Sequence, residues 1–418
     1  HDINKPYPVV DCLINPKKKV DYQNYDYLCS SSLTYFFIDY FIQKKKLNIN
    51  FKSNLIYVLL ATVCDVMPMR DLNKIIGKNV LQNFNIKNNY LIYKIFSIKK
   101  INKPLEIEDL GFLIGPILNS PGRLNNANIV VKLLVDENTT SMVKMINKLL
   151  HINEKRKMIE KNLLKEIDFK KISKDKNDVL VEYKTIINEG IIGIIASRLK
   201  EEFNKPCVVL TKSNNYYKAS ARSTSSFNIG KYIKLAIDKN IILKGGGHNL
   251  AAGFTIKNDK IDNFRFFINE AFKKNYSVVT KKYISKISLS GINNEFYNNI
   301  KDIGPFGQKN LNPIFLIDNI KIIKPKILKN NFLSFFVKGR TNKLFPSVAF
   351  TFSESDLFKT LLFNKKEISL IVQIKENFWN NKKNLQLIVL DLIDNSNKAW
   401  LIIDFTIKNS FLVPSSIG

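Results

Sequence analysis

The chain reads Gly-Gly-Gly-His-Asn-Leu-Ala-Ala-Gly from Gly245 to Gly253. Because glycine has no side chain, three consecutive glycines let a ligand come close to backbone N–H groups. Backbone donors followed by the imidazole of His248 suit an anion, and phosphate is the usual one. A flexible turn before a helix is the plainer interpretation of a glycine run. The ordered pattern of glycine, histidine and small residues favours an anion-binding loop.

Length and composition indicate a globular chain with a polyanionic partner. The 418 residues allow two to four domains, and 45% of them are apolar. No apolar run reaches the ~18 residues that a membrane span needs, and no secretory signal is visible at the start. We therefore expect a cytoplasmic protein. The formal net charge of +29 predicts binding to nucleic acid.

Arginines in this chain are more informative than lysines. Lys, Asn, Ile and Phe dominate the composition, as an AT-rich genome would dictate, so part of the lysine excess reflects codon usage. The arginines are Arg70, Arg123, Arg156, Arg198, Arg222, Arg265 and Arg340. The four cysteines show no paired spacing, which is typical of buried thiols in a reducing compartment rather than of disulfides or a zinc site.

Hydrophobic patterns divide the first part of the chain. Leu55–Val66 is almost wholly apolar and closes on Asp65, whose carboxylate is costly to bury unless it is paired or bound to a metal. From Thr139 to about Asp168 the apolar residues recur at spacings of three, four and seven. This spacing predicts a long helix, which we interpret as a connection between two domains.

From about residue 178 the pattern is that of an α/β segment, and then of a β segment. We expect strands at Val179–Tyr183, Val208–Thr211 and Tyr216–Ser223 and a helix at Gly190–Phe203. Short β-like runs separated by Asn, Lys and Gly fill residues 280–395, which indicates a small barrel.

Four separated motifs resemble those of one enzyme family. They read Gly-Pro-Ile-Leu-Asn-Ser-Pro-Gly-Arg-Leu (Gly115–Leu124), Asn-Glu-Gly-Ile-Ile-Gly-Ile-Ile-Ala-Ser-Arg-Leu (Asn188–Leu199), Ser-Ala-Arg-Ser (Ser220–Ser223) and Gly-Gly-His-Asn-Leu-Ala-Ala-Gly (Gly246–Gly253). In that order they resemble the RecJ-type single-stranded-DNA exonucleases of the DHH phosphoesterase superfamily. Leu60–Pro68 resembles the acidic metal-ligand motif of that family, and Gly304–Pro313 resembles the entry to its oligonucleotide-binding barrel.

The resemblance implies an α/β fold in several parts. We expect the remainder of a DHH phosphoesterase domain at residues 1–138, a connecting helix at 139–170, an α/β DHH-associated domain at 171–277, an OB-like barrel at 278–395 and a tail at 396–418. In the family an Asp-His-His motif is followed by Asn-Pro, and Asn15 and Pro16 stand at the spacing expected if His1 is the second histidine. We therefore expect a fragment without the front of its catalytic domain.

The resemblance also implies hydrolysis of a phosphodiester by water on two divalent cations, usually Mn²⁺ or Mg²⁺. Such cations need several carboxylates together with an imidazole. Only His1 and Asp65 match positions of that catalytic metal site. Because one carboxylate and one histidine cannot neutralise two dications, we expect this polypeptide alone to have little or no nuclease activity. A helix cap or ion pair is the alternative role for Asp65, and an unstructured terminus is the alternative for His1.

Residues from the other motifs are expected to bind the substrate. They are Arg123, Arg198, Ser220, Arg222, Ser223, Gly246, Gly247 and His248. An arginine fork can hold a phosphate with two hydrogen bonds, and a serine hydroxyl adds a donor. Such a pocket beside the metals would hold the terminal 5′ phosphate. Surface salt bridges remain the alternative for Arg198 and Arg222, and structural packing for Arg123.

Two positions depart from the family pattern. The family usually has a histidine where Asn188 stands and an arginine where Ile117 stands.

Phe306, Phe378 and Trp379 lie among lysines in the barrel segment, and aromatic side chains there could stack bases at ~1–3 kcal/mol each. Core packing is the stronger interpretation, and we expect Phe306 to be structural.

We therefore interpret the chain as part of a cytoplasmic, monomeric 5′→3′ exonuclease for single-stranded DNA that serves repair and recombination. A helicase and a single-strand-binding protein are its expected partners. One alternative is a DHH-family phosphodiesterase for short oligonucleotides or cyclic dinucleotides, although such relatives generally lack the barrel. The other is a catalytically inactive module that binds single strands.

Overall fold

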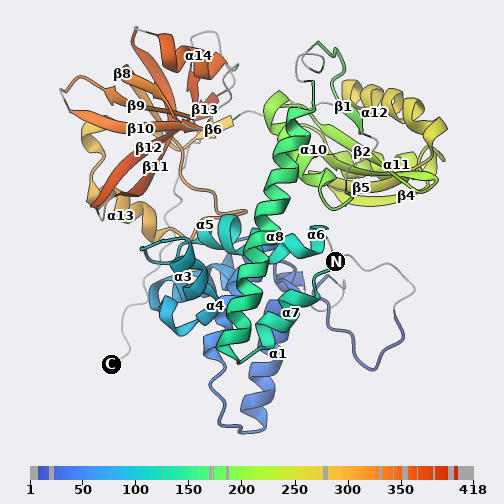
Figure 1. Ribbon diagram of the computed structural model, residues 1–418. Helices are drawn as coiled ribbons and strands as arrows, with labels where there is room; N and C mark the ends of the chain where they lie inside the picture. Colours follow the sequence, from blue (N-terminus) through green and yellow to red (C-terminus); the bar gives the residue numbers. More distant parts are fainter. Residues whose placement is uncertain are drawn as a thin grey trace. The chain divides into compact units, whose positions relative to one another are not determined.

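The computed structural model describes residues 8–17, 23–124, 126–168, 172, 174–184, 188–275, 281–328, 332–341, 343–350, 356–364, 366–379, 382–393 and 400–402 (Figure 1). The chain separates into two compact units, unit 1 (His1–Val279) and unit 2 (Thr280–Gly418). None of the helices within the described ranges is both long and apolar enough to cross a membrane.

Unit 1 begins with a layer of helices. They are α1 (Ser30–Lys44), α2 (Leu55–Cys64), α3 (Asp71–Asn83), α4 (Tyr90–Ile98), α5 (Ile107–Asp109), the π-turn η4 (Leu110–Ile114), α6 (Gly115–Leu124), α7 (Asn128–Val135) and α8 (Thr139–Lys165), with single 3₁₀ turns at Gln23–Tyr25, Lys52–Asn54 and Ile86–Asn88. The apolar run of α2 supplies Leu59 to a core that also holds Ile95 and Ile114, each with none of its surface exposed. A helix that is apolar on most faces is stable only when it is buried in this way.

Helix α8 contributes to two hydrophobic cores. Its first turn is capped by Asn138, whose side-chain oxygen accepts a hydrogen bond from the Ser141 N–H (3.0 Å). Ile146 and Leu149 pack into the helical core, whereas Ile159 packs against the next part of the unit. The long helix that the spacing predicts from Thr139 is therefore confirmed.

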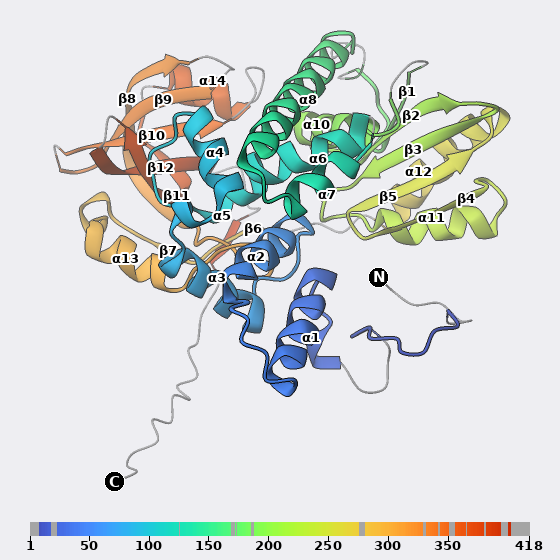
Figure 2. The same cartoon turned by 60° about the horizontal axis from the view of Figure 1, so that its bottom comes forward.

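The second half of unit 1 is a five-stranded sheet with helices on both faces. Its elements are β1 (Leu180–Lys184), α10 (Ile192–Phe203), β2 (Cys207–Ser213), β3 (Tyr216–Arg222), α11 (Ile229–Asp238), β4 (Lys244–His248), β5 (Ala251–Ile256), the 3₁₀ turn η5 (Asn258–Lys260) and α12 (Ile261–Asn275). The strand order is β1-β2-β3-β5-β4, parallel between β1 and β2 and antiparallel elsewhere. Side chains alternate between faces, so α10 covers one face and α11 and α12 cover the other (Figures 1 and 2). The expected strands and helix of this segment are confirmed.

The glycine stretch forms a β-hairpin, so the prediction of a loop was wrong. Strands β4 and β5 pair in antiparallel register around a turn at Asn249 and Leu250. A Cβ added to Gly247 would lie 2.4 Å from the Cβ of Ala252. One added to Gly230, in the first turn of α11, would lie 2.6 Å from the His248 carbonyl oxygen. Glycine is needed at these positions because strand, strand and helix approach closely.

Unit 2 is a small barrel preceded by short elements. It contains β6 (Lys281–Tyr283), β7 (Ser285–Lys286), the 3₁₀ turn η6 (Leu289–Gly291), α13 (Asn294–Asp302), β8 (Phe315–Ile327), β9 (Phe332–Lys338), β10 (Leu344–Phe350), α14 (Asp356–Phe363), β11 (Ile368–Trp379), β12 (Lys382–Ile393) and β13 (Trp400–Ile402). The sheet runs β11-β12-β10-β9-β8-β7, and β11 closes its five long strands into a barrel by pairing with β8, while the two-residue β7 adds to β8 in parallel. Leu333, Phe335 and Val337 alternate into the barrel interior.

A closed five-stranded barrel with a helix between its third and fourth strands is the OB arrangement. The predicted α/β fold with an OB-like barrel is therefore confirmed. In the expected tail, β13 pairs in parallel with β6, so at least these three residues form a strand. The finer domain limits that we expect from the sequence stay predictions.

Candidate phosphate-binding site

Arg222 and Ser220 lie side by side at the end of β3. Because they are two residues apart on a strand, they share one face of the sheet. The Arg222 Nη1 donates hydrogen bonds to the Ser220 Oγ (3.1 Å) and to the Ala221 carbonyl oxygen (2.9 Å). The guanidinium group is thus held against the strand, and its remaining N–H donors can meet a ligand.

The N-terminal end of α10 faces this pair. A Cβ added to Gly193, in the first turn of α10, would lie 3.0 Å from the Arg222 Nη2 and 3.1 Å from the Ser220 Oγ. The first N–H groups of a helix have no partner within the helix, and that end carries partial positive charge. Guanidinium, hydroxyl and helix terminus therefore converge on one place.

Arg123, in the last turn of α6, adds a second guanidinium group. Its Nη1 donates to the Gly190 carbonyl oxygen (3.2 Å). A Cβ added to Gly190 would lie 2.1 Å from the Arg123 carbonyl oxygen, so the main chains of α6 and of the segment before α10 touch directly. This contact fixes where Arg123 lies relative to α10.

The two guanidinium groups are close enough to repel each other. Burial and the charge of Arg123 both lower the pKa of Arg222. Burial and the charge of Arg156 lower the pKa of Arg123, against an opposing effect of Glu160. Within the described part of the chain, neither Arg123 nor Arg222 forms an ion pair with a carboxylate. Arg222 is partly buried and Arg123 is exposed. Two neighbouring cations without such a counter-ion make this site favourable for an anion.

Arg198 is engaged differently. Its Nε donates to Glu160 Oε1 (3.0 Å), and its Nη1 donates to Glu201 Oε2 (3.4 Å). Glu160, only 8% exposed, also accepts a hydrogen bond at Oε2 from Arg156 Nη1 (3.2 Å). Burial alone would lower the pKa of Arg198, but the hydrogen bond to Glu160 and the charges of Glu160 and Glu201 together outweigh it, and the pKa is raised. The contacts are those of the salt-bridge alternative, and a substrate role for Arg198 stays a prediction.

Ser223 and His248 lie in different surroundings. The buried Ser223 donates its hydroxyl proton to the Phe227 carbonyl oxygen (2.7 Å) and so shapes the turn before α11. His248 ends β4 with its side chain exposed, and Gly246 faces open space. No hydrogen bond between described residues joins His248 to Arg222. Substrate contacts by Ser223, Gly246, Gly247 and His248 stay predictions.

The carboxylate expected to bind a metal is exposed. Asp65 directly follows α2, and its backbone N–H bonds to the Ala61 carbonyl oxygen (2.9 Å). The expected burial cost therefore does not arise. Among the described residues there is no group of three or more His, Cys, Asp or Glu side chains that could hold a metal ion. These residues do not fit a two-metal centre, and His1 lies outside the described ranges.

The positions that depart from the family pattern have structural roles. Asn188 accepts a hydrogen bond at Oδ1 from the Gly190 N–H (2.8 Å) and forms the turn that leads into α10. Ile117 has no exposed surface and packs in the helical core. Phe306 packs against the barrel core, as expected for a structural residue. Phe378 and Trp379 belong to β11, and their side chains lie outside the described structure.

An aromatic pair that the sequence interpretation missed lies on the barrel. Phe332 on β9 and Phe350 on β10 are directly opposite each other, with ring centroids 5.4 Å apart. Phe350 is 67% exposed and Phe336, on the same face of β9, is 39% exposed. The second and third strands of an OB barrel, here β9 and β10, are the usual oligonucleotide-binding face. Alternation of Phe332, Ser334 and Phe336 with buried residues was the sequence signal for this face.

Two domain models and several curated proteins are similar to this chain. The DHHA1 domain model matches residues 176–274, and the RecJ OB domain model matches residues 285–391. The single-stranded-DNA-specific exonuclease RecJ of Bacillus subtilis (strain 168) is 24% identical over 363 residues, which cover 84% of this chain and 45% of that protein. RecJ of Haemophilus influenzae is 26% identical over 367 residues, which cover 81% of this chain and 61% of that protein. The two domain models and the RecJ relatives together support a RecJ-like member of the DHH family.

Solved structures show the same fold for this RecJ-like chain. The crystal structure of RecJ in complex with Mn²⁺ from Thermus thermophilus aligns with a TM-score of 0.70 at 18% identity. The alignment covers 84% of this chain and 51% of that one. The RecJ-like chain spans about half the length of the curated relatives it matches, between 45% and 61% for the two named above.

Proposed function

We propose that this chain belongs to a RecJ-like, metal-dependent exonuclease that degrades single-stranded DNA from the 5′ end to 5′-mononucleotides, in cytoplasmic repair and recombination, and that its described residues bind the strand. The observation that carries the proposal is the pair of guanidinium groups at the N-terminal end of α10, those of Arg123 and Arg222, which have no carboxylate partner among the described residues. The names of the curated relatives and the matching DHHA1 and OB domains support it.

The charge of the site favours a terminal phosphate over an internal one. A terminal phosphate monoester carries about −1.5 to −2 charges at neutral pH, whereas an internal phosphodiester carries a single charge. Two cations without a carboxylate partner in the described structure match the doubly charged end. Arg222 would bind it as a fork, the Ser220 hydroxyl would add a donor, and the first turn of α10 would contribute backbone N–H groups.

Hydrolysis requires more than this site provides. In the proposed enzyme Mn²⁺ or Mg²⁺ supplies an activated water and neutralises developing charge. The described residues do not assemble the ligands for such ions, so we assign to them the binding of the strand and derive no cleavage step from them.

The OB face of unit 2 would be a second binding surface for the strand. The half-buried ring of Phe332 and the exposed ring of Phe350 can stack bases, at about 1–3 kcal/mol per base and with little regard to sequence. The barrel also disfavours a phosphodiesterase specific for very short oligonucleotides, because such a substrate would not need a second binding surface.

The proposal includes two protein partners, a helicase and a single-strand-binding protein. A helicase would generate single strands for the enzyme, and a single-strand-binding protein would hold them. Size-exclusion chromatography of the chain alone and with a single-strand-binding protein tests both the expected monomer and the complex. Separate elution of the two proteins would contradict the partnership.

The proposed function is tested by binding and hydrolysis with matched oligonucleotides. We expect the chain to bind a 5′-phosphorylated single strand more tightly than the same strand with a 5′ hydroxyl. With Mn²⁺ and a 5′-labelled strand we expect little release of mononucleotides from this polypeptide, because Asp65 is the only described carboxylate that matches the metal site. Robust release in Mn²⁺ and none in EDTA would overturn that expectation and establish the activity. Equal affinity for both strands without any turnover would favour the inactive single-strand-binding module.

A further inference from the structure

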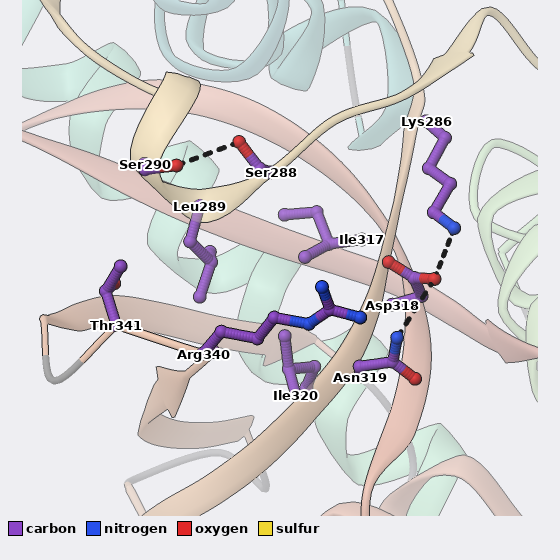
Figure 3. Close-up of a pocket in the computed structure, with 11 residues that line it drawn as sticks. Lys286, Ser288, Leu289, Ser290, Ile317, Asp318, Asn319, Ile320, Arg340 and Thr341 are labelled. Atoms are coloured by element: carbon purple, nitrogen blue, oxygen red, sulfur yellow. Dashed lines mark hydrogen bonds and ion pairs between the residues drawn. The ribbon is translucent and has the colours of Figure 1, made fainter.

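A pocket of about 270 Å³ opens in unit 2 between η6, β8 and the turn that joins β9 to β10 (Figure 3). Its floor is aliphatic and is formed by Leu289, Ile317 and Ile320, all of which belong to the barrel core. Ser288 and Ser290 stand on one side, and Arg340 extends across the pocket from the turn. The function proposed above uses none of these side chains.

Arg340 is the one arginine in the sequence of unit 2. Within the described residues its guanidinium group forms no ion pair with a carboxylate. The nearby carboxylate of Asp318 is already neutralised, because Lys286 Nζ lies 2.5 Å from its Oδ2. Arg340 therefore gives the pocket a net positive charge.

The two serines leave a hydroxyl proton for a ligand. Their Oγ atoms lie 3.0 Å apart, and the Gly291 N–H donates to the Ser288 Oγ (3.2 Å). Each hydroxyl has a single proton, and their mutual hydrogen bond uses one of the two. Whichever serine donates, the O–H of the other remains available to an acceptor in the pocket.

The fold holds the turn in place. A Cβ added to Gly339 would lie 3.2 Å from the Leu289 Cδ1, which is closer than most side chains pack. Glycine at 339 therefore lets the turn approach η6 and brings Arg340 over the aliphatic floor. The pocket is built from three separate segments of unit 2.

We propose that this pocket binds the sugar–phosphate part of a single nucleotide. The phosphate oxygens need several donors, which the Arg340 fork and the serine hydroxyl provide. The floor is aliphatic rather than aromatic, so it suits the carbon face of a pentose better than a stacked base. A cavity of ~150 Å³ accommodates benzene, and the larger pocket here has room for a pentose phosphate.

The nucleotide has two sources, a free mononucleotide or a unit within a single strand. The inference deepens the proposed function, because either source is a product or a substrate of that reaction. Its test must therefore be independent of hydrolysis and of the site in unit 1.

Binding to the full chain is measured by calorimetry in EDTA, in protein that carries Arg222→Ala. The probes are thymidine 5′-monophosphate, thymidine, inorganic phosphate and a 5′-hydroxyl oligothymidylate. In this background we expect Arg340→Ala to weaken binding of the monophosphate about tenfold, as for the loss of a charged hydrogen bond. Arg340→Lys, which keeps the charge but loses the fork, should give an intermediate loss. Lys343→Ala, an exposed cation of the same turn outside the pocket, is the matched control and should change affinity less than about twofold.

The outcomes are distinct. Weaker binding of the monophosphate alone supports a site for the free nucleotide, and weaker binding of the oligonucleotide as well supports a site on the strand path. Equal effects of Arg340→Ala and Lys343→Ala, or no binding of the monophosphate to the Arg222→Ala protein, overturn the proposal. Because Arg222 and the metal are absent throughout, failure here leaves the proposed exonuclease function untouched.

Discussion

At the scale of single residues, the site depends on which arginines have counter-ions. Arg156 and Arg198 share the buried carboxylate of Glu160, so their charges are compensated. Arg123 and Arg222 are uncompensated within the described residues, and each lies near another cation. Two neighbouring cations without a counter-ion favour the binding of an anion, so a bound phosphate would supply the missing partner. The four arginines thus divide into a pair with a carboxylate partner, Arg156 and Arg198, and a pair without one among the described residues, Arg123 and Arg222.

Replacing Arg222 tests that division. Arg222→Ala should weaken binding of a 5′-phosphorylated single strand by ~1–3 kcal/mol, because charged hydrogen bonds to the phosphate are lost. Binding of the 5′-hydroxyl strand should change much less. Fluorescence anisotropy with both strands measures the difference.

Arg265→Ala is the control for this prediction. Arg265 is held by Asp262 and by the Val181 carbonyl oxygen, away from the proposed site. If the two variants lose the same affinity, Arg222 has no specific role at the 5′ end.

The proposed binding residues could be predicted from the sequence more readily than the carboxylate that pairs with Arg198. Ser220 and Arg222 stand in a motif at the strand spacing that places them on one face, and the structure joins them by a hydrogen bond. Glu160 gave no signal, because a glutamate in an amphipathic helix is usually solvent-exposed. Its burial arises from packing between α8 and α10, which a local pattern does not contain. For the same reason the sequence did not show that Arg198 is already paired.

At the scale of elements, strands and helices with a regular spacing of apolar residues could be predicted from the sequence. The strand that forms where main chains approach each other closely could not. Strands β1, β2 and β3 and helix α10 follow from the spacing of apolar residues. The hairpin of β4 and β5 does not, because Gly245, Gly246 and Gly247 have no side chains from which to read a period. Glycine runs are weak strand formers, so the contacts of β4 with β5 and α11 are what stabilise it as a strand.

The hairpin offers a test with neighbouring glycines. A Cβ on Gly247 would clash with Ala252 at 2.4 Å, whereas a Cβ on Gly246 meets nothing within 4 Å. Gly247→Ala should therefore lower the free energy of unfolding by about 1–3 kcal/mol, the usual cost of overpacking.

Gly246→Ala is the internal control and should be neutral or slightly stabilising, because alanine is preferred to glycine in a strand interior. Urea denaturation followed by circular dichroism measures both variants. Equal stabilities would show that the close contact between β4 and β5 does not form.

At the scale of the whole molecule, the charge of the chain bears on the nucleic-acid binding that we propose. A formal net charge of +29 with only seven arginines means that most of the attraction comes from solvated lysines. Such attraction brings a polyanion to the surface quickly but does not select an end or a sequence. In the proposed function, selectivity would come from the sites in units 1 and 2, and the lysines would supply the general affinity.

The salt dependence of DNA affinity separates the general contribution of the lysines from the contribution of Arg222. Affinity for a single strand should fall as salt rises, with a slope of log K against log [salt] of about −0.7 for each phosphate neutralised. Arg222→Ala should make the slope shallower by about 0.7 for a 5′-phosphorylated strand. Titrations between ~50 and ~200 mM salt measure it. An uncharged peptide nucleic acid of the same sequence is the control, and a salt-independent affinity for DNA would contradict an electrostatic interface.

The contact between Gly190 and Arg123 has a further consequence for a chain of this composition. Glycine codons begin with two guanines, so a bias toward A and T works against every glycine in the sequence. At Gly190, however, a Cβ would lie 2.1 Å from the Arg123 carbonyl oxygen. Any other residue would therefore push α6 away from α10. Surface positions can change to lysine or asparagine under this bias, whereas Gly190 cannot be replaced. The position of Arg123 against the segment before α10 therefore depends on a glycine that compositional bias cannot replace.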